Sequence, residues 1–269
     1  MRYRLVAADL DGTLLDSESR IQERTVGSVR DFRAHGGYFV IASGRAESTM
    51  RPYAEQLGLD EPIIAFNGGK LASLKTGESI YETFLGAEKG ICAYHALRAL
   101  GKVIVVYHEG RPYSAEMNPI VERYRKRIKM EVGFFGDARE VVNEATKKLL
   151  VIDPSREFKR MIDVLRPIYG DDLNCVNSED EYFEVLPPGT SKGHALLIAA
   201  EWLGVPMREV VAVGDHLNDI SMIEAAGVGV AVANAAPATL DAADYVTESN
   251  DDDGVGKLLR RIMGDEPLR

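Results

Sequence analysis

Acidic side chains directly follow two apolar runs of the chain, at positions that suit metal or acid–base chemistry. Asp9 and Asp11 follow the first run, and Asp215 and Asp219 follow a later one. At an effective dielectric of about 20, two carboxylates about 4 Å apart repel by about 4 kcal/mol, so a cluster of them requires a cation. The candidate ligands are hard oxygens with no His or Cys pairing, so the pattern predicts a Mg²⁺ site with room for an anion.

Two further polar side chains occur where they could hold an anion. Ser43 ends another apolar run and precedes a helical segment, so its hydroxyl and the following N–H groups can contact an anion. Lys192 follows the loop Pro187–Ser191 and opens a helix, whose dipole also favours anions. Fixed positive potential opposite a metal ion is what a transferring phosphoryl group requires. Together these residues predict phosphoryl-transfer chemistry.

Strands that are buried on both faces must position these side chains. Short unbroken apolar runs occur at Leu5–Ala8, Tyr38–Ala42, Pro62–Phe66, Val210–Val213 and Val228–Val232. Such runs are typical of parallel strands covered by helices, and helical segments separate them here. The alternation predicts an α/β fold with a doubly wound, mostly parallel, Rossmann-like sheet. Because sites in such sheets form outside the carboxyl ends of the strands, we expect the polar residues to converge there.

The middle of the chain has a different pattern. Four segments have strand character, helical stretches separate several of them, and none runs into a polar loop of the kind described above. We therefore expect an inserted α+β domain at 82–188, between two parts of a core domain at 1–81 and 189–269. The four segments are Val103–Tyr107, Lys148–Ile152, Asn174–Ser178 and Tyr182–Leu186.

Composition excludes several classes of partner. The 32 basic and 42 acidic residues among 269 give a net charge of −10, which disfavours nucleic acid and anionic lipid as partners. The sequence contains two cysteines, Cys92 and Cys175, which are far apart and have no metal-binding spacing. So few cysteines are usual in a protein of a reducing compartment. Neither a signal-peptide core nor an apolar run long enough to span a membrane occurs. We expect a cytoplasmic protein that acts on a small molecule; nothing in the sequence indicates an oligomeric state.

The order of the motifs resembles that of the haloacid dehalogenase-like phosphohydrolases. The DxDGT segment Asp9–Thr13 is similar to the first motif of that family, and the apolar run into Ser43 is similar to the second. Lys192 resembles the third motif, and the GDxxND segment Gly214–Asp219 resembles the fourth.

Two segments resemble the Cof-type sugar-phosphatase branch of the family in particular. They are Ser43–Arg45 and Asn67–Gly69. The insertion between the second and third motifs resembles the cap domain of that branch, which is of type C2B. The resemblance implies a substrate among small phosphorylated metabolites, above all sugar phosphates.

The resemblance also implies a two-step mechanism. Asp9 would be the nucleophile that forms an aspartyl-phosphate, and Asp11 would protonate the leaving oxygen and then deprotonate the attacking water. Mg²⁺ would be bound by the carboxylates of Asp9 and Asp215 and the backbone carbonyl of Asp11, while Asp219 would orient the metal's waters. Ser43 and Lys192 are further candidates for a catalytic role. The residues implied in binding phosphate or substrate are Leu10, Ser43, Gly44, Arg45, Asn67, Lys192 and Asn218.

Some alternatives stay open at this level. A phosphomutase or phosphotransferase would use the same aspartyl-phosphate with a different acceptor, and a receiver-like module phosphorylated on Asp would combine similar residue types without turnover. Arg45 and Asn67 suit either a substrate contact or the bracing of a loop. The acidic run Asp251–Asp253 is expected to be a solvated loop whose charge favours the following helix.

Overall fold

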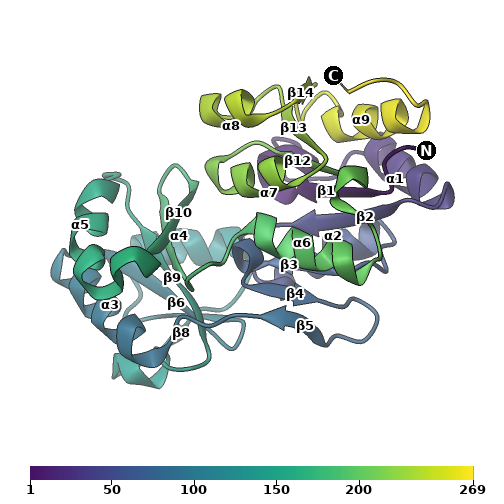
Figure 1. The fold of residues 1–269 in the computed structure, drawn as a ribbon. Helices are drawn as coiled ribbons and strands as arrows, with labels where there is room; N and C mark the ends of the chain where they lie inside the picture. Colours follow the sequence, from purple (N-terminus) through teal and green to yellow (C-terminus); the bar gives the residue numbers. More distant parts are fainter. Residues whose placement is uncertain (269) are drawn as a thin grey trace. The chain divides into compact units, whose positions relative to one another are not determined.

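The computed structural model describes residues 1–268, which form two compact units (Figure 1). The first unit contains residues 1–82 together with the chain from residue 191 onward, and the second contains Thr83–Thr190. Each unit has its own β-sheet and its own buried apolar core.

An eight-stranded sheet forms the centre of the first unit, in the order β14-β13-β12-β1-β2-β3-β4-β5. The strands from β14 to β3 are parallel, whereas β4 and β5 add an antiparallel hairpin at one edge. All residues of β1, β12 and β13 are buried, as expected for strands covered on both faces. The strands are β1 (Leu5–Asp9), β2 (Tyr38–Ala42), β3 (Ile63–Ala65), β4 (Lys70–Ala72), β5 (Ser79–Glu82), β12 (Val210–Gly214), β13 (Val228–Val232) and β14 (Tyr245–Thr247).

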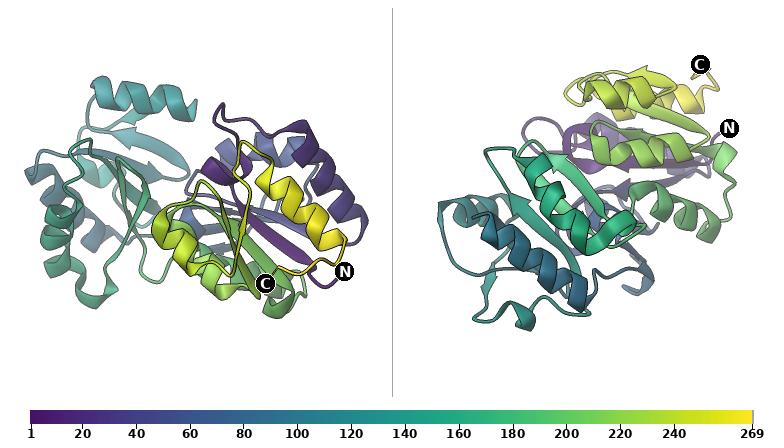
Figure 2. Two further views of the ribbon diagram at one scale, coloured as in Figure 1. Left: turned by 90° about the horizontal axis from the view of Figure 1, so that it is seen from above. Right: turned by 60° about the vertical axis from the view of Figure 1, so that its left-hand side comes forward.

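Helices cover both faces of this sheet. On one face α6 and α7 pack through small and apolar side chains such as Ala195, Ala199 and Met222. On the other face α1 and α9 lie side by side, as Figure 2 shows. The prediction of a doubly wound α/β fold is thus confirmed. The helices are α1 (Glu23–Ala34), α2 (Glu47–Gln56), α6 (Lys192–Trp202), α7 (Ile220–Ala225), α8 (Pro237–Ala242) and α9 (Gly254–Met263), with short helical turns at Leu10–Leu14, Phe66–Gly68, Met207–Glu209 and Leu217–Asp219.

The strand register brings the ends of neighbouring strands to one edge of the sheet. Asp9, the last residue of β1, pairs with Ala42, the last residue of β2, and Ala42 pairs with Ile64 of β3. On the other side of β1, Ala8 pairs with Val213, one residue before the end of β12. The loops that follow β1, β2, β3 and β12 therefore begin side by side, as the rule for parallel sheets requires.

The acidic run near the C-terminal end differs from expectation at one position. Asp251 and Asp252 are exposed, but Asp253 is buried and accepts hydrogen bonds from Thr25 and Arg260. Its carboxylate thus links α1 to α9, because a buried carboxylate is stable only when hydrogen-bonded and paired. The expectation of a fully solvated loop was wrong for this residue.

The second unit is an α+β arrangement around a six-stranded sheet, in the order β10-β11-β9-β6-β7-β8. Its pairs are antiparallel except for β7 with β8. Helices α3 and α5 pack on one face, and on the other face the hydroxyl of Tyr107 is hydrogen-bonded to that of Tyr124 in α4. The elements are α3 (Ala87–Ala99), β6 (Val103–His108), β7 (Arg111–Ser114), α4 (Pro119–Ile128), β8 (Gly133–Phe134), β9 (Thr146–Ile152), α5 (Phe158–Tyr169), β10 (Asn174–Glu179) and β11 (Tyr182–Leu186), with short turns at Ala138–Glu140 and Gly170–Asp172.

The helices of residues 1–268 are short or carry polar residues along their length. None of them combines the length and apolarity needed to span a bilayer.

Candidate active site

The chain leaves β1 at Asp9 in a tight turn that keeps the next residues at the sheet edge. Gly12 in this turn has φ +79°, a conformation that strains any residue with a Cβ. A Cβ on Gly12 would also lie 2.5 Å from Oδ2 of Asp215, closer than atoms can approach. The glycine therefore lets the turn pack directly against the Asp215 carboxylate.

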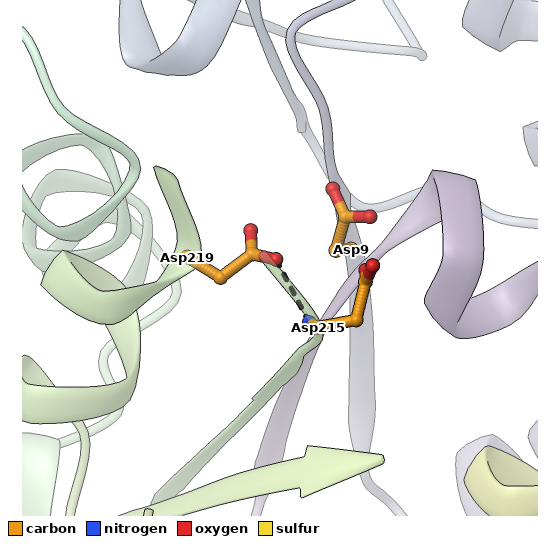
Figure 3. Close-up of side chains that lie close together, drawn as sticks. All are labelled: Asp9, Asp215 and Asp219. Atoms are coloured by element: carbon orange, nitrogen blue, oxygen red, sulfur yellow. Dashed lines mark hydrogen bonds between the residues drawn. The ribbon is translucent and has the colours of Figure 1, made fainter. Parts of the chain in front are cut away.

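Three carboxylates gather at this edge. One oxygen each from Asp9, Asp215 and Asp219 lies within 4.8 Å of the others, and Figure 3 shows the side chains pointing toward one another. Asp9 ends β1, Asp215 follows β12, and Asp219 ends the short turn after it. An all-oxygen, anionic donor set of this kind suits a hard divalent cation.

Asp219 is already engaged by the protein through both of its oxygens. Its Oδ2 accepts the backbone N–H groups of Asp215 and His216, at 2.9 and 3.0 Å, and its Oδ1 accepts from the Lys192 ammonium. Asp215 is different, because Thr13 donates to its Oδ1 at 2.7 Å and no described residue donates to its Oδ2. Asp215 is thus the better candidate for a direct ligand, whereas Asp219 holds the loop on which Asp215 lies.

Lys192 is the cation of the cluster. Its side chain is almost fully buried at the start of α6, where Ser191 caps the helix by accepting the N–H of His194 at 3.1 Å. The ammonium donates to Asp9 and to Asp219. Burial alone would lower the pKa of Lys192, but Asp219 and Asp9 outweigh burial and raise it, so the side chain stays charged.

The carboxylates of the cluster resist ionisation when no cation is bound. Burial, followed by repulsion from Asp219 and Asp215, raises the pKa of Asp9 well above its usual value despite the attraction of Lys192. Burial and Asp219 likewise raise the pKa of Asp215 to about 7, against the hydrogen bond from Thr13. A bound divalent cation would supply the charge that the metal-free site lacks.

A pH titration of stability tests this electrostatic description. The pKa of Asp215 is about 7 in the folded protein and near 3.8 in the unfolded chain, so the folded state binds more protons between these values. The carboxylate therefore lowers the free energy of unfolding as pH rises through this window, and the loss is complete above it. In EDTA, we expect Asp215→Asn to equal the unsubstituted protein in stability near pH 4 and to exceed it at pH 8, in urea unfolding. A difference in stability between the two proteins that does not grow with pH would contradict the raised pKa of Asp215.

Asp11 departs from the arrangement expected for it. Its carboxylate lies outside the close cluster and forms a two-pronged ion pair with Arg45, with Nε–Oδ2 at 2.8 Å and Nη2–Oδ1 at 2.5 Å. The Arg45 guanidinium also lies over the ring of Tyr53. Burial alone would lower the pKa of Arg45, but the neighbouring Asp11 outweighs burial and raises the pKa of Arg45. Arg45 thus braces Asp11 here.

The loops after β2 and β3 carry the remaining predicted polar residues. The carbonyl of Ser43 accepts the N–H of Asn67 at 3.0 Å, and its hydroxyl accepts the N–H of Arg45 at 3.2 Å. Gly44 packs against the amide of Asn67, and Asn218 donates to that amide's oxygen at 2.9 Å. The buried Oδ1 of Asn218 has no hydrogen-bond partner among residues 1–268, which leaves it available to a ligand.

Leu10 completes the set of residues expected at the site. Its side chain is fully buried, so only its backbone can face a ligand. All the predicted site residues therefore lie on the loops at this one edge of the first unit, or at the start of α6 beside it.

Three residues at the site were not predicted from the sequence. Thr13 orients Asp215, and Asn234 and Asn250 hydrogen-bond the turn after β1. Asn234 and Asn250 follow β13 and β14, so the rule that loops after parallel strands share one edge could have identified them. Thr13 lies within the DxDGT segment itself.

Comparisons with known proteins show what the whole chain is similar to. A model of the haloacid dehalogenase-like hydrolase family matches residues 6–259. Phosphatase YwpJ of Bacillus subtilis is 29% identical over 97% of this chain and 100% of its own. The 5-amino-6-(5-phospho-D-ribitylamino)uracil phosphatase YcsE of Bacillus subtilis is 31% identical over 96% of this chain and 94% of its own. The crystal structure of a haloacid dehalogenase-like hydrolase from Bacteroides thetaiotaomicron has a TM-score of 0.86 and 30% identity, covering 97% of this chain and 99% of that one.

Proposed function

Because the chain belongs to the haloacid dehalogenase-like hydrolase family, we propose that it is a Mg²⁺-dependent phosphatase of small phosphorylated metabolites that works through an aspartyl-phosphate. Hydrolysis of phosphate monoesters is the activity named for its relatives. The observation that carries the proposal is the cluster of buried Asp9 and Asp219 with half-buried Asp215, in which Lys192 pairs with the two buried members.

Asp9 is the proposed nucleophile and Asp11 the proposed acid and base. Lys192 donates to Oδ1 of Asp9, and no described residue donates to Oδ2, so Oδ2 is the oxygen that attacks phosphorus. The bond from phosphorus to the leaving oxygen breaks, and Asp11 gives that oxygen a proton. Asp11 then takes a proton from water as the water attacks phosphorus, which releases phosphate and frees Asp9.

Arg45 is the partner of the Asp11 carboxylate between these steps. The two-pronged ion pair orients the carboxylate that is proposed to accept the proton of water. When substrate binds, Arg45 is proposed to turn toward the substrate phosphate, another anion that its guanidinium can bind in a two-pronged manner. With this exchange of partners, Arg45 would fill both roles left open from the sequence, the bracing of a loop and a contact with the substrate.

Mg²⁺ fits the donor set. The proposed ligands are the carboxylates of Asp9 and Asp215 and the backbone carbonyl of Asp11, while Asp219 acts through the loop and the metal's waters, because its own oxygens are already hydrogen-bonded. When bound, the ion neutralises charge on the transferring phosphoryl group and shields Asp9 from the incoming anion.

The proposed cradle for the phosphoryl group combines charge with hydrogen-bonding groups. Lys192 lies beside Asp9 and keeps its charge, and the Asn218 amide has an unused acceptor that a hydroxyl or water could fill. The other proposed members of the cradle are Ser43, Gly44, Arg45 and Asn67, together with the backbone of Leu10.

The second unit is proposed to be the C2B-type cap that selects the substrate. It is a contiguous insertion with its own core, which is what a domain that opens and closes over a site requires. Sugar phosphates are the proposed substrates, since one relative at 31% identity is named for a ribityl phosphate ester. A cytoplasmic location is proposed from the two cysteines, both of which are free thiols.

Phosphate release from a panel of phosphate monoesters tests the function. The panel includes hexose, pentose and ribityl phosphates, each assayed with Mg²⁺ and again with excess EDTA. We expect at least one ester to be hydrolysed, and EDTA to remove the activity until Mg²⁺ is restored. Hydrolysis that persists in EDTA would contradict the metal-dependent mechanism. Conversion of a 1-phosphate to a 6-phosphate without release of phosphate would identify a phosphomutase instead.

A further inference from the structure

The turn after β1 is held from outside by a side chain that belongs to none of the proposed catalytic groups. Asn234, in the loop after β13, donates from Nδ2 to the backbone carbonyl of Gly12 at 2.8 Å. Gly12 lies between Asp11 and Thr13, so this bond fixes the turn in the middle of the motif that carries the proposed nucleophile and acid.

Asn234 is itself held in place at its other end. The backbone N–H of Asn250, in the loop after β14, donates to Oδ1 of Asn234 at 2.9 Å. The side chain of Asn250 donates to the carbonyl of Leu15 at 2.9 Å, and Gln22 donates to the carbonyl of Asn250 at 3.0 Å. The turn after β1 is thus tied at two carbonyls to two loops from elsewhere in the sheet.

The loop that carries Asn234 also holds the segment that bears Asp215. The N–H of Ala236 donates to the backbone carbonyl of Asp215 at 2.8 Å. One short loop therefore contacts the backbone at Gly12 and at Asp215, in the segments that follow β1 and β12 and lie beside the proposed metal site. A shift of either backbone changes the spacing between Asp9 and Asp215.

The distance between the turn after β1 and the Asp215 carboxylate can change little. The position of a Cβ on Gly12 would lie 2.5 Å from Oδ2 of Asp215 and 3.2 Å from its Oδ1, so the Gly12 backbone is in close contact with the carboxylate. Asn234 is exposed and packs into no core, so its contribution to stability is small and its hydrogen bonds act on the geometry of the turn.

We propose that Asn234 is a positioning residue, which holds the Gly12 carbonyl so that Asp9 and Asp11 keep the correct distance from Asp215. The inference rests on the proposed function for its effect on turnover, but not for its effect on metal binding. Outer partners of metal ligands commonly change metal affinity or activity by about 10- to 100-fold when they are removed. Asn234 reaches the ligands through the backbone, and we expect it to act at the lower end of that range.

Two variants of Asn234 and one control separate positioning from stability. Asn234→Ala removes both hydrogen bonds, whereas Asn234→Asp keeps the acceptor for Asn250 and replaces the donor by an oxygen that the Gly12 carbonyl repels. Asn118→Ala is the control, because Asn118 also hydrogen-bonds backbone, accepting the N–H groups of Ile120 and Val121 as the cap of α4. The control is expected to lower Tm without touching the site.

The experiment is a calorimetric titration of each protein with Mg²⁺, without substrate, followed by kcat on the best ester. We expect both Asn234 variants to weaken Mg²⁺ binding by about 10-fold and to lower kcat at saturating Mg²⁺, while Asn118→Ala keeps both values. Unchanged binding in Asn234→Asp, or equal weakening in Asn118→Ala, would overturn the proposal. If the unsubstituted protein hydrolyses no ester, the proposed function fails, yet the titration still decides the role of Asn234.

Discussion

Asp9→Asn is expected to lower kcat by about 10⁴-fold or more without lowering the stability of the metal-free protein. The activity is lost because the amide cannot attack phosphorus. Stability is kept because burial and the neighbouring Asp219 and Asp215 disfavour the charged form of Asp9, so a neutral isostere relieves repulsion. Initial rates of phosphate release and urea unfolding in EDTA measure the two effects.

A surface carboxylate supplies the control for this substitution. Asp163→Asn makes the same chemical change at an exposed residue of α5 that pairs with Lys159. It is expected to keep full activity, since surface ion pairs contribute little. Activity of Asp9→Asn within tenfold of the unsubstituted protein would remove Asp9 from the proposed mechanism.

Lys192→Met has the second largest expected effect, and here stability falls together with activity. The substitution keeps the length of the side chain but leaves the buried carboxylates of Asp9 and Asp219 without their cation. Removing one partner of a buried ion pair typically costs about 3–5 kcal/mol, because the remaining charge has lost its compensation. We expect a loss of this size in the free energy of unfolding at pH 8, measured in EDTA.

The pH dependence of that loss identifies its cause. The pKa of Asp9 is already raised and rises further without Lys192, so at pH 5 protonation neutralises part of the uncompensated charge. The destabilisation should therefore be smaller at pH 5 than at pH 8, and adding Asp9→Asn to Lys192→Met should recover part of it at pH 8. An equal loss at both pH values, with no recovery, would indicate lost packing and would contradict the charge cluster.

The sequence predicted the parts of the site that depend on strand ends. Asp9, Ser43 and Asp215 each follow an apolar run, and parallel register alone brings such positions together. The pairing of Arg45 with Asp11 could not be predicted in this way. It depends on where a long, flexible side chain turns after leaving β2, which neither spacing nor periodicity encodes.

The strands missed from the sequence are short and lie at a sheet edge or next to one. Lys70–Ala72 and Tyr245–Thr247 contain three residues each, too few for any periodicity to be recognised. Asp253 was missed for another reason. Its burial follows from the contact of α9 with α1, which places Thr25 and Arg260 around it, and an acidic run taken alone is typical of a solvated loop.

The most direct test of the mechanism is to locate the phosphoryl group on the enzyme during turnover. Acid quenching of the reaction within milliseconds, followed by peptide mass spectrometry, would be applied to the unsubstituted protein and to Asp11→Asn, in which water attack is slowed. We expect the mass of one phosphoryl group on the peptide that contains Asp9, at higher occupancy in Asp11→Asn. A phosphoryl group on any other residue, or phosphate release by Asp9→Asn at an undiminished rate, would contradict an aspartyl-phosphate at Asp9.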